Sequence, residues 1–411
     1  MSRRLGFHVT KAARVAVSLH PACFCRCTDR WMRSGATCAI AEDRLCQFLS
    51  ADLICLAAQE ATPISLRQVL DAATPQQAAE LSRRELPIRF AKRIQHIEEL
   101  PGWQRSRELR DLRSLYFQSF RELRLVDTDG ANLAGFTEAV VRLKSRLQTA
   151  VPRLMDAVRE LQEEGLGLNE AAMEQWLDTF LLARIGTEML TSQYVACIND
   201  CSIVHGRCDP AAICGRASEK ARWLIMQHYR RAGQTVRIEV ETVPGASGDA
   251  GRLRFTYVPN YLYYMVLELL KNSARATVET ASDQAHIQAR PIVVTVSANA
   301  GQVAIRVQDQ AGGIPFEVSD RVWSYMYSTE ETRADSWEHQ GSPLAGYGVG
   351  LPLSRLYARY LGGSLHLMSM PGEGTSAFLY LKRLGEEASE DLGTCGCNEA
   401  GWHTGSIPPD C

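Results

Sequence analysis

The sequence has no long hydrophobic run, and this absence bounds the kind of protein that it encodes. No apolar stretch approaches the ~18–20 residues that a membrane-spanning helix needs, so we expect no membrane span. Basic and acidic residues nearly balance, and the formal net charge is −2. A chain without a basic excess lacks the electrostatic footprint of a nucleic-acid-binding protein, so we expect no nucleic-acid partner.

Two recurrent motifs are also missing. The chain has 13 cysteines, but it lacks the paired Cys-x2-Cys hooks of a zinc site, so we expect no structural zinc. The odd count favours reduced thiols over a frame of disulfides. No Gly-Lys-Ser/Thr follows a glycine-rich loop, which excludes a P-loop, and no internal repeat is visible.

The two ends of the chain differ in composition from the middle. Residues 1–35 are rich in arginine and carry a single acid, Asp29. This pattern predicts an organelle transit segment over residues 1–45, with a disordered basic tail as the alternative. Beyond Glu386 the chain is acidic and rich in glycine, so residues 387–411 are expected to form a flexible tail.

The first half of the remaining chain, residues 46–205, is predicted to be helical. Ser65 precedes an apolar run and is a candidate helix N-cap. Helical periodicity, interrupted by turn-forming residues, covers residues 88–100, 107–125, 136–165 and 168–199. Long helices with short breaks predict an up-and-down four-helix bundle.

One histidine in this region has the spacing of a phosphoacceptor. His96 and Pro101 match the His-x4-Pro pattern of sensor kinases, in which the histidine is autophosphorylated. A solvated histidine at a helix end before a proline stop gives the same pattern, and we favour this interpretation.

The second half, residues 206–386, has a mixed pattern that predicts an α/β sandwich. We expect a helix from Pro210 to about residue 232, and a polar lid over residues 328–344. Strands are predicted over residues 236–242, 253–258, 292–298, 303–308, 364–370 and 376–381. Residues 245–251 are predicted to be a hairpin loop between the first two strands. The sheet should be mixed, with helices on one face.

The chemistry of this half begins on a predicted helix. Glu268, Asn272 and Arg275 follow the spacing i, i+4 and i+7, so they share one helix face. A carboxylate, an amide oxygen and a guanidinium on one face suit a general base, a hard-metal ligand and an anion partner. A solvated helix face with an ion pair is the alternative.

Three glycine-containing motifs follow this helix. Asp309 ends a strand before Gly312 and Gly313, where a carboxylate can accept from a ligand amine, although a plain turn has the same pattern. The next motif, residues 346–352, opens a helix, where backbone N–H groups can face phosphates. The last motif is Gly-Glu-Gly-Thr, residues 372–375.

Together, the order and spacing of the four motifs resemble the nucleotide-binding boxes of one ATP-binding fold. That fold is shared by sensor histidine kinases, type II topoisomerases, the large heat-shock chaperones and mismatch-repair ATPases. The sequence between the boxes, at residues 321–329 and 343–360, is similar to that of the mitochondrial pyruvate dehydrogenase kinase family. The segment Leu-Pro-Ile-Arg-Phe-Ala at residues 86–91 is similar to this family as well. The resemblance covers roughly residues 64–385.

This resemblance implies roles for matched residues. Glu268 would be the general base toward a substrate serine, and Asn272 would bind Mg²⁺. Asp309 would accept a hydrogen bond from the adenine amino group of ATP. The glycines Gly346, Gly348 and Gly350 would line the triphosphate. Other residues matched to nucleotide-binding positions are Lys271, Arg275, Gly313, Ser328, Thr329, Tyr347, Val349, Leu351 and Thr375.

The resemblance also implies the biological setting. It predicts a protein-serine kinase of the mitochondrial matrix that phosphorylates the E1α subunit of the pyruvate dehydrogenase complex. Such a kinase would dock on the lipoyl domain of E2 through its helical bundle, as a homodimer. The alternatives are a kinase of the branched-chain α-ketoacid dehydrogenase complex, a catalytically weak nucleotide-gated module that binds E2, and a sensor histidine kinase.

Two residues depart from the family pattern. Ala311 stands where the wider superfamily has a glycine. Tyr264 lies one turn before Glu268, where pyruvate-type kinases carry a histidine oriented toward the base. A tyrosine there is more like the branched-chain kinase, whereas residues 325–329 look pyruvate-type.

Overall fold

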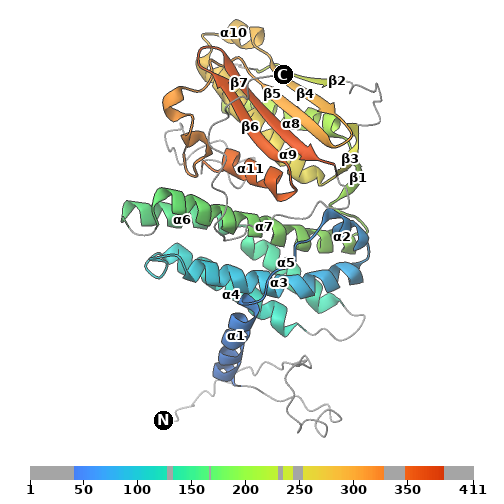
Figure 1. The fold of residues 1–411 in the computed structure, drawn as a ribbon, viewed down its shortest axis with the longest axis vertical. Coiled ribbons are helices and arrows are strands. Elements are labelled where there is room, and N and C mark those ends of the chain that lie inside the picture. The colour runs from blue at the N-terminus through green and yellow to red at the C-terminus, as the bar shows by residue number, and fades with distance from the viewer. Residues whose placement is uncertain are drawn as a thin grey trace, which may run out of the picture.

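A helical part and a sheet part make up the fold (Figure 1). The computed structural model describes residues 41–126, 133–165, 168–229, 235–243, 253–327 and 348–383. The predicted tail at 387–411, the predicted lid at 328–344 and nearly all of the predicted transit segment lie outside these residues. No helix of the described residues is long and apolar enough to cross a membrane.

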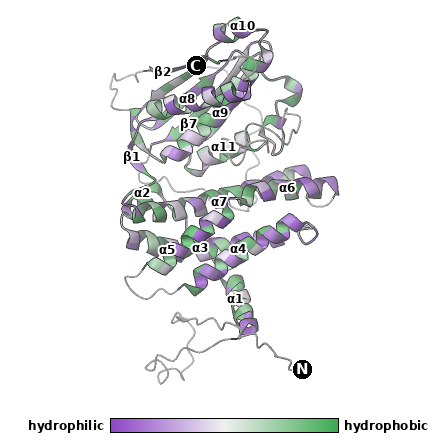
Figure 2. Cartoon of the chain, turned by 180° about the vertical axis from the view of Figure 1, so that it is seen from behind, coloured by the Kyte–Doolittle hydropathy of each residue, from purple (hydrophilic) through white to green (hydrophobic). Residues whose placement is uncertain are grey.

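The helical part contains a bundle of long helices. Its elements are α1 (Glu42–Ala57), α2 (Leu66–Asp71), α3 (Pro75–Glu98), α4 (Arg107–Leu125), α5 (Ala134–Leu147), α6 (Ala150–Glu163) and α7 (Glu170–Ile198). The bundle consists of α3, α4, α7 and the consecutive pair α5–α6. Hydrophobic and hydrophilic residues alternate along these helices, as expected when each helix buries one face (Figure 2). The predicted N-cap, Ser65, accepts from the backbone N–H of Gln68.

The predicted helix over residues 136–165 is in fact two helices. The chain breaks at Gln148 and Thr149, between α5 and α6. The physical reason is Pro152, which has no N–H to donate and would clash with the preceding turn of a continuous helix. When the helix restarts at Ala150, Pro152 falls in the first turn, where no intrahelical donor is needed.

The sheet part is the α/β sandwich that the sequence predicts. Its helices are α8 (Pro210–His228), α9 (Pro259–Thr280), α10 (Gln284–Ala289) and α11 (Gly350–Tyr360). Its main strands are β2 (Ile238–Val243), β4 (Ile292–Ala298), β5 (Gln302–Gln308), β6 (Ser364–Met370) and β7 (Gly374–Lys382), in the order β2-β4-β5-β7-β6. Strand β2 runs parallel to β4, and the other pairs are antiparallel. Helices α8, α9 and α11 pack on the sheet.

The predicted hairpin around residues 245–251 is wrong. Strand β3 (Phe255–Tyr257) pairs with β1 (His205–Cys208) and not with β2. The physical reason is that β3 has only three residues and leads directly into α9 through Pro259. Because α9 packs on β4 and β5, its start directs β3 away from the edge where β2 lies.

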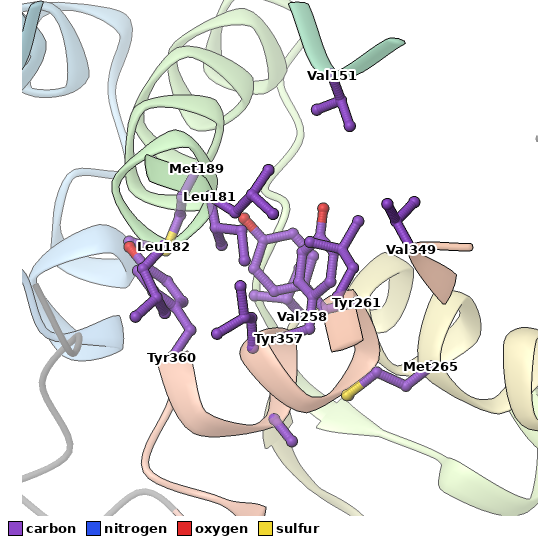
Figure 3. Packing of buried hydrophobic residues seen from close by; sticks show 14 of the residues in the cluster. Val151, Leu181, Leu182, Met189, Val258, Tyr261, Met265, Val349, Tyr357 and Tyr360 are labelled. Carbon is purple, nitrogen blue, oxygen red and sulfur yellow. Dashed lines mark hydrogen bonds between the residues drawn. The ribbon is translucent and has the colours of Figure 1, made fainter. Parts of the chain in front are cut away.

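The two parts of the chain share one hydrophobic core where α7 meets α9 and α11 (Figure 3). Tyr261 and Tyr357 pack with ring centroids 4.8 Å apart, and both side chains are buried. The hydroxyl of Tyr360 donates to the sulfur of Met189 at 3.8 Å. Burying several aromatic side chains at one junction is worth several kcal/mol, on the order of 2 kcal/mol each. The helical part is therefore packed firmly against the helices that carry the site described next.

Candidate active site

A cavity of about 340 Å³ lies between α9, the start of α11 and the ends of β5 and β7. Ten of the residues that the sequence singled out line it: Glu268, Asn272, Arg275, Asp309, Gly313, Gly348, Val349, Gly350, Leu351 and Thr375. Four others, Ser328, Thr329, Gly346 and Tyr347, lie outside the described residues. Lys271 is not among the lining residues. Four motifs that are distant in the sequence are therefore brought together at one cavity.

A buried ion pair holds the carboxylate at one end of the cavity. Glu268 is only 6% exposed, so the alternative of a solvated helix face does not apply to it. The ammonium of Lys271, one turn further along α9, lies 3.1 Å from Oε2 and 3.3 Å from Oε1 of Glu268. Lys271 therefore contacts the carboxylate from beneath the cavity wall, and does not face the cavity itself.

The residue at position 350 must be small because of this carboxylate. A Cβ atom at Gly350 would lie 2.6 Å from Oε2 of Glu268, well inside van der Waals contact. Gly350 is the first residue of α11, so the carboxylate packs directly against the start of that helix. Gly348 has a φ of +65°, and a Cβ there would lie 2.7 Å from the carbonyl oxygen of Tyr327. The two glycines thus allow the chain to pack closely against Glu268 at one point and against Tyr327 at the other.

Tyr264 does not orient Glu268. Its ring packs on Tyr357 with centroids 5.0 Å apart, and its buried hydroxyl has no hydrogen-bond partner among the described residues. Burial, followed by the nearby Glu268 carboxylate, holds the pKa of Tyr264 well above its usual range. Tyr264 is therefore a neutral packing residue, and the described contact that holds the Glu268 carboxylate comes from Lys271.

At the other end of the cavity a second buried carboxylate is held by three donors. The Ser273 hydroxyl donates to Oδ2 of Asp309 at 2.7 Å. The backbone N–H groups of Ala311 and Thr375 both donate to Oδ1 at 3.1 Å. Because the donors come from α9, from the turn after β5 and from β7, the orientation of the Asp309 carboxylate is fixed.

The turn after Asp309 is shaped by close backbone packing. Gly313 has a φ of +72°, and a Cβ there would lie 2.2 Å from the carbonyl oxygen of Met370. Ala311 has no left-handed φ, so its methyl group is accommodated at the cavity wall without backbone strain. Nearby, Ser369 and Thr375 hydroxyls lie 2.9 Å apart, and Ser369 accepts from the backbone N–H of Ile314 at 2.7 Å.

The polar face of α9 also lines the cavity. Asn272 is exposed there, so its amide oxygen is accessible to a ligand or a metal ion. Arg275, one turn along, pairs with Glu279 at 3.4 Å. The cavity therefore offers two buried carboxylates, an amide and a guanidinium.

Sequence reasoning missed Ser273 and Ser369. Both hold other residues in place, through contacts with residues 36 and 6 positions away. Ser273 is adjacent to Asn272 in the first motif, and this position could have indicated that Ser273 belongs to the site. Its partner, however, can be identified only once α9 and β5 are placed side by side.

His96 is half-buried near the end of α3, where it packs against α7. Its ring stacks on Trp176 with centroids 4.6 Å apart, and its Nε2 donates to the Trp176 carbonyl oxygen at 3.1 Å. Burial, with a smaller contribution from Arg93, lowers the pKa of His96 to about 4. The histidine is thus neutral and occupied by a structural contact. It lies near the end of α3, as we favoured, but the expectation that it is solvated is wrong, because Trp176 of α7 packs over its ring.

This depressed pKa predicts a pH dependence of stability. As pH falls from about 6.5 toward 4, the unfolded chain binds a proton at His96 before the folded chain does, so the free energy of unfolding should fall by about 1–3 kcal/mol. Urea denaturation of the wild type and of His96→Gln at several pH values measures this. The wild type should lose more stability than the variant over this range. Parallel curves for the two proteins would contradict the prediction.

Comparisons with known proteins agree with the fold. Residues 257–384 match the model of the histidine kinase-, DNA gyrase B- and HSP90-like ATPases. Residues 63–209 match the model described as mitochondrial branched-chain alpha-ketoacid dehydrogenase kinase. The class of protein is therefore a kinase that joins a helical domain to an ATPase-type domain.

The relatives narrow the class to a family. Pyruvate dehydrogenase (acetyl-transferring) kinase isozyme 3 of Homo sapiens is 34% identical over 377 residues, which is 85% of this chain and 89% of the relative. The mitochondrial enzyme of that name from Arabidopsis thaliana is 34% identical over 323 residues, with 75% and 85% covered. The one from Drosophila melanogaster is 31% identical over 366 residues, with 84% and 88% covered. The chain belongs to the pyruvate dehydrogenase kinase family.

Proposed function

We propose that this chain is a protein-serine kinase that transfers phosphate from Mg-ATP to the E1α subunit of the pyruvate dehydrogenase complex. The observation that carries the proposal is the presence of two buried, oriented carboxylates, Glu268 and Asp309, in one cavity. The names of the relatives, as pyruvate dehydrogenase kinases, support the choice of substrate.

In the proposed reaction, Glu268 takes the proton of a substrate serine hydroxyl. The serine oxygen then forms a bond to the terminal phosphorus of ATP, while the bond from that phosphorus to the bridging oxygen breaks and ADP leaves. Positioned general bases typically contribute about 10²–10⁴ in rate. The ion pair with Lys271 supports this role because it fixes the carboxylate at the cavity wall.

Nucleotide recognition is assigned to the opposite end of the cavity. Because Asp309 is held by three donors and faces the cavity, it is a preformed acceptor for the adenine amino group. Thr375, Gly313 and Leu351 line the cavity and complete the surroundings of the nucleotide. Gly346, Gly348 and Gly350, with Tyr347 and Val349, are assigned to the triphosphate, and Ser328 and Thr329 to the border of the lid.

The donor set near Asn272 fits Mg²⁺. This ion usually keeps several waters and takes only one or two protein ligands together with substrate phosphates. The described residues contain no group of three or more His, Cys, Asp or Glu side chains that could hold a metal alone, and Asn272 presents an amide oxygen to the cavity. When bound, Mg²⁺ would offset the charge of the phosphates. Arg275 and Lys271 add positive charge along α9.

The proposal includes partners and location. The relatives are named as mitochondrial, so we place the chain in the mitochondrion, and more finely in the matrix. We set the end of the transit segment before Glu42, because Leu45 and Leu49 of α1 are buried in the core. The helical part, up to about residue 205, would dock on the lipoyl domain of E2.

A homodimer is the proposed assembly, and one face of the sheet supports it. No described helix covers the sheet face opposite α8 and α9. Phe378 and Tyr380 stack there with centroids 6.4 Å apart, and Met368 and Met370 are each 66% exposed. A second copy of the chain would remove this apolar surface from water.

The experiment that tests the substrate uses labelled ATP. The purified mature chain is incubated in parallel with reconstituted pyruvate and branched-chain dehydrogenase complexes. Acid-stable label on a serine of the pyruvate E1α is the expected result. Label on the branched-chain E1α alone would identify the branched-chain complex as the substrate instead. Two observations favour this alternative: Tyr264, and the match of residues 63–209 to the family model described as branched-chain alpha-ketoacid dehydrogenase kinase. Nucleotide binding without transfer to either complex would leave only a nucleotide-gated module.

A further inference from the structure

A side chain of the helical part reaches the wall of the nucleotide cavity. Asp178 lies on α7, and its carboxylate accepts a hydrogen bond from the hydroxyl of Tyr325. The guanidinium of Arg359, in the last turn of α11, lies 3.7 Å from the same carboxylate. Asp178 therefore connects one helix of the bundle to the segment that carries Tyr325 and to α11.

Tyr325 belongs to a short segment, Arg321 to Tyr327, that forms part of the cavity wall. Val322 and Tyr327 from this segment line the cavity. Tyr325 itself is 7% exposed, and burial, followed by the charge of Asp178, raises its pKa well above the usual range. The phenol is therefore a permanent donor to Asp178 at physiological pH.

The segment is strained at one residue and tightly packed at the next. Met326 has a φ of +63°, in the left-handed region that non-glycine residues rarely adopt and that costs about 1–3 kcal/mol where it is forced. Its Cα and the carbonyl oxygen of Tyr327 lie 2.9 Å and 2.7 Å from where a Cβ on Gly348 would be. Such a conformation persists only when the surrounding structure holds it. Here it is held on one side by the hydrogen bond from Tyr325 to Asp178, and on the other by the close packing against Gly348.

Two further contacts involve the same segment, one that joins it to α11 and one within the segment. The Arg355 guanidinium of α11 lies 5.0 Å from the centre of the Trp323 ring, and Arg321 stacks over Tyr327 at 4.7 Å. Both contacts are within the sheet part. Among the hydrogen bonds described, the one from Tyr325 is the contact that reaches α7 from this segment.

We propose that Asp178 is a positioning residue for the nucleotide site, acting from the helical part through Tyr325 and Arg359. By holding Tyr325, it keeps Met326 and Tyr327 against the glycine turn. By pairing with Arg359, it keeps α11 aligned, so that Gly350 stays against Glu268. The inference rests on the proposed nucleotide site.

The test measures binding of Mg-ADP by calorimetry together with kcat and the KM for ATP. The variants are Tyr325→Phe, which removes only the hydroxyl, Asp178→Asn, and the double variant. The matched control is Glu174→Gln, one turn earlier on α7, which removes a charge that Tyr325 senses without breaking its hydrogen bond. Melting temperatures without nucleotide separate a general loss of stability from an effect on the site.

Each single variant is expected to raise the Kd and KM by about 5- to 20-fold, as for loss of a hydrogen bond to a charged group, with less than a twofold change in kcat. The double variant should resemble Asp178→Asn, because Tyr325 acts through Asp178 and the loss of that carboxylate already includes the loss of the Tyr325 contact. Glu174→Gln should stay within about twofold of the wild type. Unchanged affinity in Tyr325→Phe, effects that multiply in the double variant, or an equal effect of Glu174→Gln would each overturn the inference. If the wild type itself does not bind Mg-ADP, the proposed nucleotide site fails instead.

Discussion

Replacing Glu268 with glutamine is expected to slow phosphate transfer by about 10²- to 10⁴-fold while nucleotide affinity stays within a few-fold of the wild type. The amide keeps the size of the side chain but cannot accept the serine proton. The measurement is kcat for transfer from labelled ATP, with Mg-ADP binding measured on the same preparation. Loss of kcat with retained binding would establish that the carboxylate acts in the chemical step.

Two controls make this result specific. Glu219, exposed on α8, allows the same glutamate-to-glutamine change away from the cavity, and Glu219→Gln should be fully active. Because Lys271 is buried against Glu268, the glutamine variant leaves an unpaired ammonium, and a lower melting temperature is expected. If Glu268→Gln keeps more than about a tenth of the activity, the assignment of the general base is wrong.

Replacing Asp309 with asparagine is expected to weaken nucleotide binding by about 100-fold or more, because a site built around a buried acceptor tolerates its loss poorly. The new amide nitrogen is a hydrogen-bond donor, and it faces another donor, either the Ser273 hydroxyl or the ligand amine. It also faces the N–H groups of Ala311 and Thr375 with one acceptor fewer. Calorimetric titration with Mg-ADP, and with Mg-GDP to follow base preference, measures the effect.

The matched control for this variant is Asp283→Asn. Asp283 caps the short helix α10, and asparagine is an equally good N-cap, so the same chemical change should alter neither stability nor affinity. An Asp309→Asn protein that is folded and binds Mg-ADP within about threefold of the wild type would show that this carboxylate does not recognise the nucleotide.

Much of the site could be predicted because its chemically important residues lie in short motifs that are local in the sequence. The i, i+4, i+7 spacing of Glu268, Asn272 and Arg275 places them on one helix face, and the structure has all three at the cavity. Alternation of buried and exposed residues gave strands at 292–298 and 364–370 with the bounds that the structure has.

The remainder depends on contacts between distant segments, which a single sequence does not display. The strand pairing of β3 with β1 depends on where α9 packs, and the hydrogen bond from Ser273 to Asp309 requires α9 beside β5. The break before α6 could have been predicted from Pro152, since a proline so far into a 30-residue helix carries a large energetic cost. The connection of Asp178 to Tyr325 spans 147 residues and has no local signature.

The most direct test of the account is a crystal structure of the chain with Mg²⁺ and a non-hydrolysable ATP analogue. The account predicts the adenine amino group within hydrogen-bond distance of Asp309, the metal ion bound to Asn272, and the terminal phosphate next to Glu268 at the start of α11. A nucleotide bound elsewhere, or bound here with its phosphates toward Asp309, would contradict the assignment of the two carboxylates and with it the proposed mechanism.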